Sequence, residues 1–150
     1  MADRTGIYYK PKIEQTLTGW STSYAQGRWS SCTDLEELVI HGLTALNNLA
    51  GRIANYCPNL TVLKLPDLAG SSNSYIVGSC PKLTEIQVGS IGRAMTSLYS
   101  NSFSGSTSAD LVITIYVKDS TAIPLSGSPF GATNATIVYR SSTTGEVRTE

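Results

Sequence analysis

The side chains that could carry chemistry in this sequence are one histidine, three cysteines and many hydroxyls. His41 is the single histidine and lies close to Glu36 and Glu37, which would suit an acid–base role. However, the chain has no Gly-x-Ser-x-Gly elbow, no phosphate loop ending in Gly-Lys-Ser/Thr and no His-Glu-x-x-His zinc motif. We therefore predict that the protein is not an enzyme, and that His41 is a solvated residue at the end of a strand.

The cysteines are Cys32, Cys57 and Cys80, which are 25 and 23 residues apart. An odd number with such wide gaps does not indicate a disulfide framework, and zinc sites need cysteine pairs about two to four residues apart. We predict buried free thiols and neither a metal nor a cofactor. The alternative is a disulfide, because stacked cysteines would lie about 5 Å apart at Cα.

Each cysteine opens a similar phrase, Cys-x-x-Leu-x-x-Leu/Ile-x-aliphatic, at 32–40, 57–65 and 80–88. Looser copies follow at 112–117 and 134–139. The expected anchors of the five copies are Leu38, Leu63, Ile86, Ile115 and Ile137. A leucine pattern that recurs every 20–29 residues is typical of a leucine-rich-repeat solenoid.

The spacing inside each copy predicts how the copies pack. Aliphatic residues at i and i+2 lie on one face of a short strand, and only stacking against the next copy buries that face. The apolar spacing over 43–55 predicts a return helix. We expect an α/β fold, a short leucine-rich-repeat solenoid with a mainly parallel sheet of about five short strands.

Three regions follow from this pattern. Residues 1–31 are predicted to form an irregular N-terminal capping segment, in which Trp20 and Trp29 seal the first coil; an aromatic platform for a sugar or a partner is the alternative. Residues 32–140 form the repeat domain. Residues 141–150 are polar and are expected to form a flexible tail.

The phrases Tyr-Cys-Pro-Asn-Leu at 56–60 and Gly-Ser-Cys-Pro-Lys-Leu at 78–83 resemble the bacterial BspA-like class of leucine-rich repeats. Phe-Ser-Gly-Ser at 103–106 fits the same pattern without the cysteine. The resemblance implies a non-catalytic module for adhesion or recognition. Such repeats are also similar to those of some bacteriophage structural proteins, which implies a phage-encoded member as one possibility.

Composition excludes several function classes. The 150-residue chain has a net charge of zero and only 15% charged residues, which argues against nucleic-acid binding. No apolar run is long enough to insert into a membrane, and the first residues lack the features of a secretory signal. The chain is therefore expected in the cytoplasm as encoded, in a virion if phage-encoded, or at the cell surface if trimmed from a longer protein.

The best candidate for a binding site is the outward face of the repeat strands, where side chains should form columns. One expected column is Val39, Lys64, Gln87, Tyr116 and Val138, and the next is Glu37, Val62, Glu85, Thr114 and Thr136. Lys118 and Arg140 are expected near His41 at the far side. The alternative is that this face of the sheet is exposed to solvent and has no binding function.

The sequence therefore predicts a recognition module that binds a protein or a glycan through the outer face of a solenoid. A rigid, preformed face would lose little freedom on binding. The alternative is a structural component of a virion or another assembly, which would form a homo-oligomer.

Overall fold

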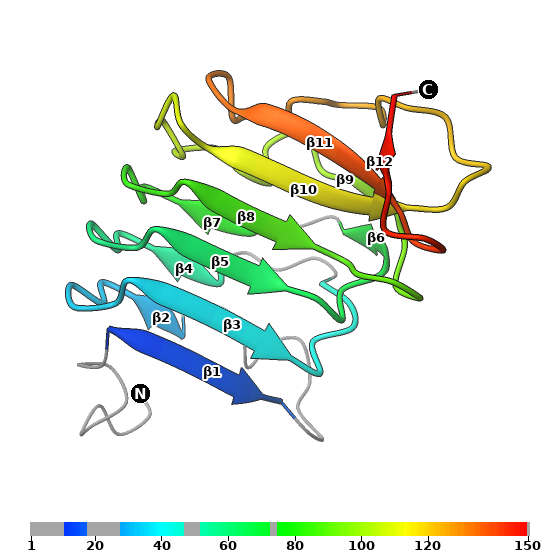
Figure 1. The fold of residues 1–150 in the computed structure, drawn as a ribbon. Coiled ribbons are helices and arrows are strands. Elements are labelled where there is room, and N and C mark those ends of the chain that lie inside the picture. Colours follow the sequence, from blue (N-terminus) through cyan, green and yellow to red (C-terminus); the bar gives the residue numbers. More distant parts are fainter. Residues whose placement is uncertain (1–10, 18–27, 47–51, 73–74, 150) are drawn as a thin grey trace.

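The computed structural model describes residues 11–17, 28–46, 52–72 and 75–149, and over these the chain winds as a β-solenoid of about five laps (Figure 1). Each lap contributes one strand to a parallel front sheet. In spatial order its strands are β1 (Lys12–Thr16), β3 (Glu37–His41), β5 (Val62–Leu65), β8 (Glu85–Val88), β10 (Val112–Val117) and β11 (Thr136–Ser141).

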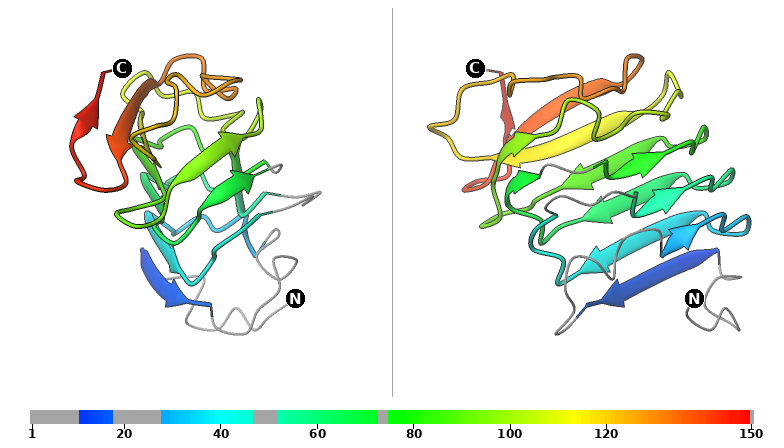
Figure 2. Two further views of the ribbon diagram at one scale, coloured as in Figure 1. Left: turned by 90° about the vertical axis from the view of Figure 1, so that its right-hand side faces the viewer. Right: turned by 180° about the vertical axis from the view of Figure 1, so that it is seen from behind.

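Shorter strands form the other sides of the coil. The back sheet consists of β2 (Trp29–Ser30), β4 (Ala54–Asn55) and β7 (Val77–Gly78), which lie nearer the viewer than the front strands in the rear view of Figure 2. On the return path, β6 (Gly70–Ser72) pairs with β9 (Met95–Leu98). The last strand, β12 (Val147–Arg148), runs antiparallel to β11.

The core lies between the two sheets and consists of stacked aliphatic side chains. Leu38, Leu63 and Ile86 are fully buried and are direct neighbours on adjacent parallel strands. Burying one such side chain stabilises the fold by about 1.5–3 kcal/mol. The predicted stacking of Leu63 beside Ile86 is therefore confirmed, and with it the solenoid.

The predicted return helix over 43–55 is wrong in the part that is described. Leu46 forms an isolated parallel bridge with Ser72, and Ala54–Asn55 is the strand β4. Leucines three residues apart fit a solenoid corner as well as a helix, because each corner needs one buried apolar side chain. The described residues form no helix, so none of them builds a helix that could cross a bilayer. The α/β class is accordingly replaced by an all-β solenoid.

Both ends of the chain differ from the expected cap and tail. Within residues 1–31, β1 pairs with β3 and β2 pairs with β4, so this segment supplies strands to both sheets. Trp29 is fully buried in β2, whereas Trp20 lies outside the described residues. In the tail, β12 folds back on β11, because Ser141 begins a tight turn whose backbone closes onto Glu146.

The fourth lap is in a different register from the predicted one. Ile86 pairs with Ile113, not with Ile115, which pairs with Val88. The run from Leu111 to Val117 alternates throughout, so a shift of two residues leaves every side chain on its expected face. The sequence pattern therefore could not decide between the two registers.

The corners before β3, β5, β8, β10 and β11 share one backbone feature. A residue with positive φ is followed by a small buried side chain. In the first three such corners the first residue is not glycine: Ser31 (φ 57°), Tyr56 (φ 54°) and Ser79 (φ 48°) precede Cys32, Cys57 and Cys80. In the last two, Gly105 (φ 86°) and Gly131 (φ 84°) precede Ser106 and Ala132.

Candidate functional site

The outward face of the front sheet presents its side chains in regular columns. The register of the strands defines a first column of Lys12, Glu37, Val62, Glu85, Val112 and Thr136. The second column is Glu14, Val39, Lys64, Gln87, Thr114 and Val138. Tyr116 pairs with Arg140 in a third column. We call this surface the front face.

Most predicted column members lie as expected, and the exceptions come from the shifted fourth lap. Val39, Lys64, Gln87 and Val138 share a column, and so do Glu37, Val62, Glu85 and Thr136. Thr114 takes the place predicted for Tyr116, and Val112 takes the place predicted for Thr114. Glu14 and Lys12 extend the columns by one strand that the sequence pattern did not reveal.

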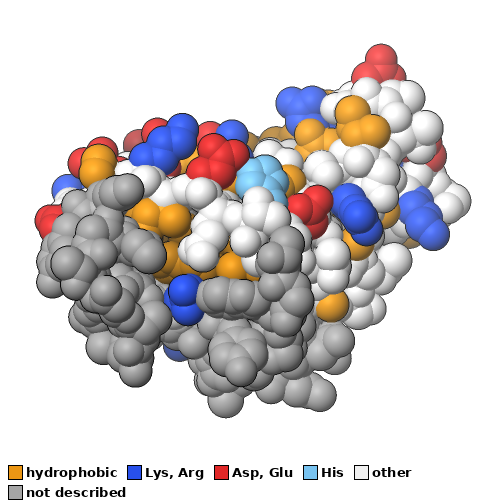
Figure 3. All heavy atoms as spheres, turned by 90° about the horizontal axis from the view of Figure 1, so that it is seen from below, with side chains coloured by type: hydrophobic (Ala, Val, Ile, Leu, Met, Phe, Trp, Pro, Cys, Tyr) orange, Lys and Arg blue, Asp and Glu red, His pale blue; other side chains and the backbone are white. Residues whose placement is uncertain are grey.

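Opposite charges join neighbouring strands across the front face. Lys12 pairs with Glu37, and Lys64 pairs with Glu85, each with 3.1 Å between nitrogen and oxygen. Figure 3, which views the molecule from below, shows charged side chains of both signs close to the single histidine. Exposed pairs of this kind contribute about 0.2–1 kcal/mol each, so they define the pattern of the surface more than its stability.

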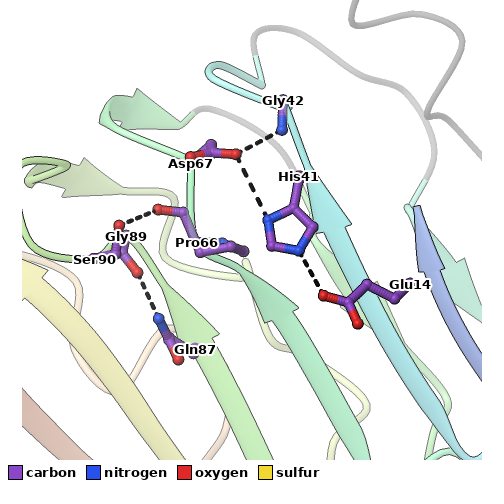
Figure 4. A network of polar contacts seen from close by, with 8 residues as sticks. All are labelled: Glu14, His41, Gly42, Pro66, Asp67, Gln87, Gly89 and Ser90. Carbon is purple, nitrogen blue, oxygen red and sulfur yellow. Dashed lines mark hydrogen bonds and ion pairs between the residues drawn. The ribbon is translucent and has the colours of Figure 1, made fainter. Parts of the chain in front are cut away.

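His41 lies at the carboxyl end of β3 between two carboxylates (Figure 4). Its Nε2 lies 2.9 Å from Oε1 of Glu14 on β1. Its Nδ1 lies 4.0 Å from Oδ2 of Asp67, which also accepts a hydrogen bond of 2.6 Å from the backbone N–H of Gly42. The hydrogen bond from His41 lowers the pKa of the Glu14 carboxyl below its usual value.

The contacts of this histidine suit a structural or binding role. It is half-exposed at the strand end, as the sequence predicts. The nearby hydroxyl of Ser90 donates its hydrogen bond to the Pro66 carbonyl at 2.6 Å, away from His41 (Figure 4). The contacts of His41 with Glu14 and Asp67 therefore link three neighbouring laps. The histidine does not activate the Ser90 hydroxyl, which is directed to Pro66.

Lys118 and Arg140 do not lie near His41, contrary to the prediction. β5 and β8 stand between the strand of His41 and β10. Arg140 donates a hydrogen bond of 2.8 Å to the carbonyl of Gly145 in the C-terminal turn. Residues that follow equivalent strands share an edge of the sheet, but several strand spacings of about 4.8 Å separate them along that edge.

The three cysteines are free and buried, as the sequence predicts. The thiol of Cys57 donates to the Trp29 carbonyl at 2.8 Å, and the thiol of Cys80 donates to the Gly78 carbonyl at 3.2 Å. The neighbouring Cys57 thiol, together with burial, raises the pKa of the Cys80 thiol. No cluster of three or more histidine, cysteine or acidic residues among the described residues could hold a metal ion.

A groove at the carboxyl ends of the front strands is a second candidate, which the sequence analysis missed. It has a volume of about 860 Å³. We call it the corner groove, and its lining residues are Ala69, Gly70, Ile91, Gly92, Ala94, Thr96, Lys118, Asp119, Ser120, Ser142 and Thr143. Of these only Lys118 was predicted as a site residue, because small and hydroxyl side chains in turns resemble ordinary loop composition.

No family model, no curated protein and no solved structure matches this chain. The geometry by itself defines the class of protein: a parallel β-solenoid with a charged front face and a groove at one corner.

Proposed function

We propose that the protein is a non-catalytic recognition module that binds a partner protein or a glycan through the front face. The observation that carries this proposal is the strict register of the front strands, which holds side chains from five or more laps in fixed columns. Repeat solenoids commonly bind along such extended surfaces. The Cys-x-x-Leu phrases support membership of the BspA-like leucine-rich repeats as part of the same proposal.

Rigidity favours this function. The inward neighbours of the column residues, such as Ile40, Leu65 and Val88, are fully buried, so the backbone under the columns is fixed on its core side. A face that is already ordered loses little conformational entropy when a partner binds.

The chemistry of the face favours a partner with mixed polarity. Val39, Val62 and Val138 are half-buried; the first two lie between charged neighbours in the columns, and Val138 lies beside Thr114. Lys64 is already paired with Glu85, so the face does not present an unbalanced positive field to nucleic acid. Small apolar patches beside charged side chains are typical of protein surfaces that bind other proteins.

A surface-binding experiment tests the proposal. The labelled chain would be compared with the double variant Val39→Asp/Gln87→Lys on arrays of glycans and of surface proteins, and Tyr56→Ser, away from the front face, serves as the matched control. We expect binding that the double variant loses and the control keeps. Equal binding by all three proteins would contradict the proposal.

The same samples test the assembly alternative. Light scattering coupled to gel filtration should report a monomer if the chain is a recognition module. A closed, stable oligomer that the Val39→Asp/Gln87→Lys variant disrupts would mean that the front face joins copies of this chain, and would favour a structural role in a virion or another assembly.

A further inference from the structure

The lining of the corner groove includes several residues with minimal side chains. Gly70 (φ +73°) and Gly92 (φ +80°) line the groove, and a Cβ built on either would meet no atom within 4 Å. Both positions therefore face open space, and Ala69 and Ala94 beside them add only a methyl group each. A ligand in the groove could approach the backbone closely, which is a known use of glycine at binding sites.

One wall of the groove carries two adjacent opposite charges, Lys118 and Asp119. Hydroxyls of Ser141 and Thr143 hydrogen-bond to the Asp119 carboxylate and lower its pKa. The wall is held in place by Arg148, whose Nη1 donates to the carbonyls of Lys118 at 2.9 Å and Thr121 at 2.8 Å. The positive charge of Arg148 also acts on the Asp119 carboxylate, so the wall offers an acceptor beside two cationic side chains.

The lining of the groove also includes an exposed aliphatic side chain. Ile91 is 62% exposed, although it is among the largest apolar residues of the chain. A Cβ built on Gly145 would lie 3.4 Å from its Cδ1, which places Ile91 beside the C-terminal turn. Thr96, Ser120 and Thr143 contribute hydroxyl side chains to the same lining.

From this arrangement we propose that the corner groove binds a neutral oligosaccharide. Sugar hydroxyls can donate to Asp119 and accept from Lys118, while the C–H face of a pyranose ring packs on Ile91. The Asp119 carboxylate in the lining disfavours a phosphate or another anion beside it, and the volume lies in the range of small-ligand sites. This inference rests on the proposed function, and it names the glycan class and a separate site for it.

Amide chemical-shift titration with maltotriose, cellotriose, chitotriose and lactose tests the proposal. We expect at least one of these sugars, at about 10 mM or below, to shift the amides of Gly70, Gly92 and Ser120. The variants Asp119→Asn and Ile91→Ser should each weaken that binding about tenfold, and Gly92→Asn, which fills the groove, should abolish it. Asp110→Asn, an exposed carboxylate on another corner, should bind like the original chain.

Several outcomes would overturn the proposal. One is that no sugar shifts these amides; another is that inorganic phosphate or a basic peptide shifts them and the sugars do not. A third is that binding survives both Asp119→Asn and Ile91→Ser in variants whose thermal unfolding matches that of the original chain. The front-face variant Val39→Asp/Gln87→Lys separates the two proposals. If this variant no longer binds the partner found on the array but still shows the sugar-induced shifts, both proposals stand. If the original chain binds a partner on the array but no sugar shifts the groove amides, only the groove proposal fails.

Discussion

The laps from β1 to β8 and the laps from β10 to β11 build the same coil from different residues. In the earlier laps, the corners before the front strands place Ser31, Tyr56 and Ser79 at positive φ and follow them with cysteines. In the later laps, Gly105 and Gly131 take that backbone conformation. The comparison teaches that the repeat is a backbone conformation with a small buried side chain after it, and that cysteine is only one way to provide that side chain.

The front face shows the same division. Charged residues occupy the columns from β1 to β8, including Lys12, Glu37 and Lys64, whereas β10 and β11 place Val112, Thr114, Thr136 and Val138 in the two main columns. Charged ladders and threonine–valine ladders are both compatible with parallel pairing. The solenoid therefore tolerates two surface chemistries on one scaffold.

The largest expected effect comes from the glycine corners. A Cβ on Gly105 would lie 2.5 Å from the backbone nitrogen of Ser79, and the residue has φ 86°. Gly105→Ala should therefore lower the free energy of unfolding by about 3 kcal/mol or more, since strain and overlap add. Urea unfolding measures this loss. Ser104→Ala, at the preceding residue, is the control and should lower the free energy of unfolding far less. Equal losses would mean that the corner at Gly105 does not pack against the corner at Ser79.

The cysteine corners should respond in the opposite direction. Ser79 already has a positive φ of 48°, which is unfavourable for a residue with a Cβ. Ser79→Gly should raise the free energy of unfolding by about 1 kcal/mol, because removal of the Cβ relieves more strain than the added chain entropy costs. Thermal unfolding checks the sign. A loss of stability would show that the two kinds of corner are not equivalent.

A smaller effect should reveal the register where the two halves of the solenoid meet. Val112 lies directly opposite Glu85, and Thr114 lies opposite Gln87. In the variant Val112→Lys the new lysine should couple favourably to Glu85 by about 0.5 kcal/mol in a double-mutant cycle. Thr114→Lys should couple less to the same glutamate. A stronger coupling of Thr114→Lys than of Val112→Lys to Glu85 would favour the register predicted from the sequence, in which Thr114 lies opposite Glu85.

The smallest effect is expected from the charged end of the front face. The pKa of Glu14 is lowered from 4.5 in the folded chain, mainly by the hydrogen bond from His41. Its stabilising contribution is therefore complete above that ordinary value and is lost as the pH falls through the lower folded value. Unfolding measured over a pH series should show this decline in the original chain and a weaker one in Glu14→Gln. Identical curves would mean that the contact with His41 adds nothing.

The sequence predicted the fold best where apolar spacing and a distinctive residue coincide. Cys57 and Cys80 each mark a corner, and the leucines after them fixed the register of β5 beside β8. Around Leu111, no cysteine marks the corner, and a shift of two residues preserves the alternation. The spacing of Leu43 and Leu46 suited a helix as well as a coil corner, so the return path was misassigned.

The front face was largely predictable, and the corner groove was not. Columns follow from strand register, which repeats along the chain and can be counted from residues such as Val39 and Lys64. The groove joins segments near Gly70, Gly92 and Asp119, which come from different laps and carry no shared pattern. Glycine in a turn looks the same in a sequence whether it only closes the turn or also leaves space for a ligand.

The direction of β12 has a consequence for the length of the molecule. Parallel strands can be added to such a sheet one after another, but β12 runs the opposite way along β11 and follows it after only five intervening residues (Figure 1). β12 thus blocks this edge of the sheet, because a new parallel strand would have to displace it from β11. By pairing with Tyr139 and Arg140, β12 also protects that part of the edge of β11 from pairing with a strand of another molecule.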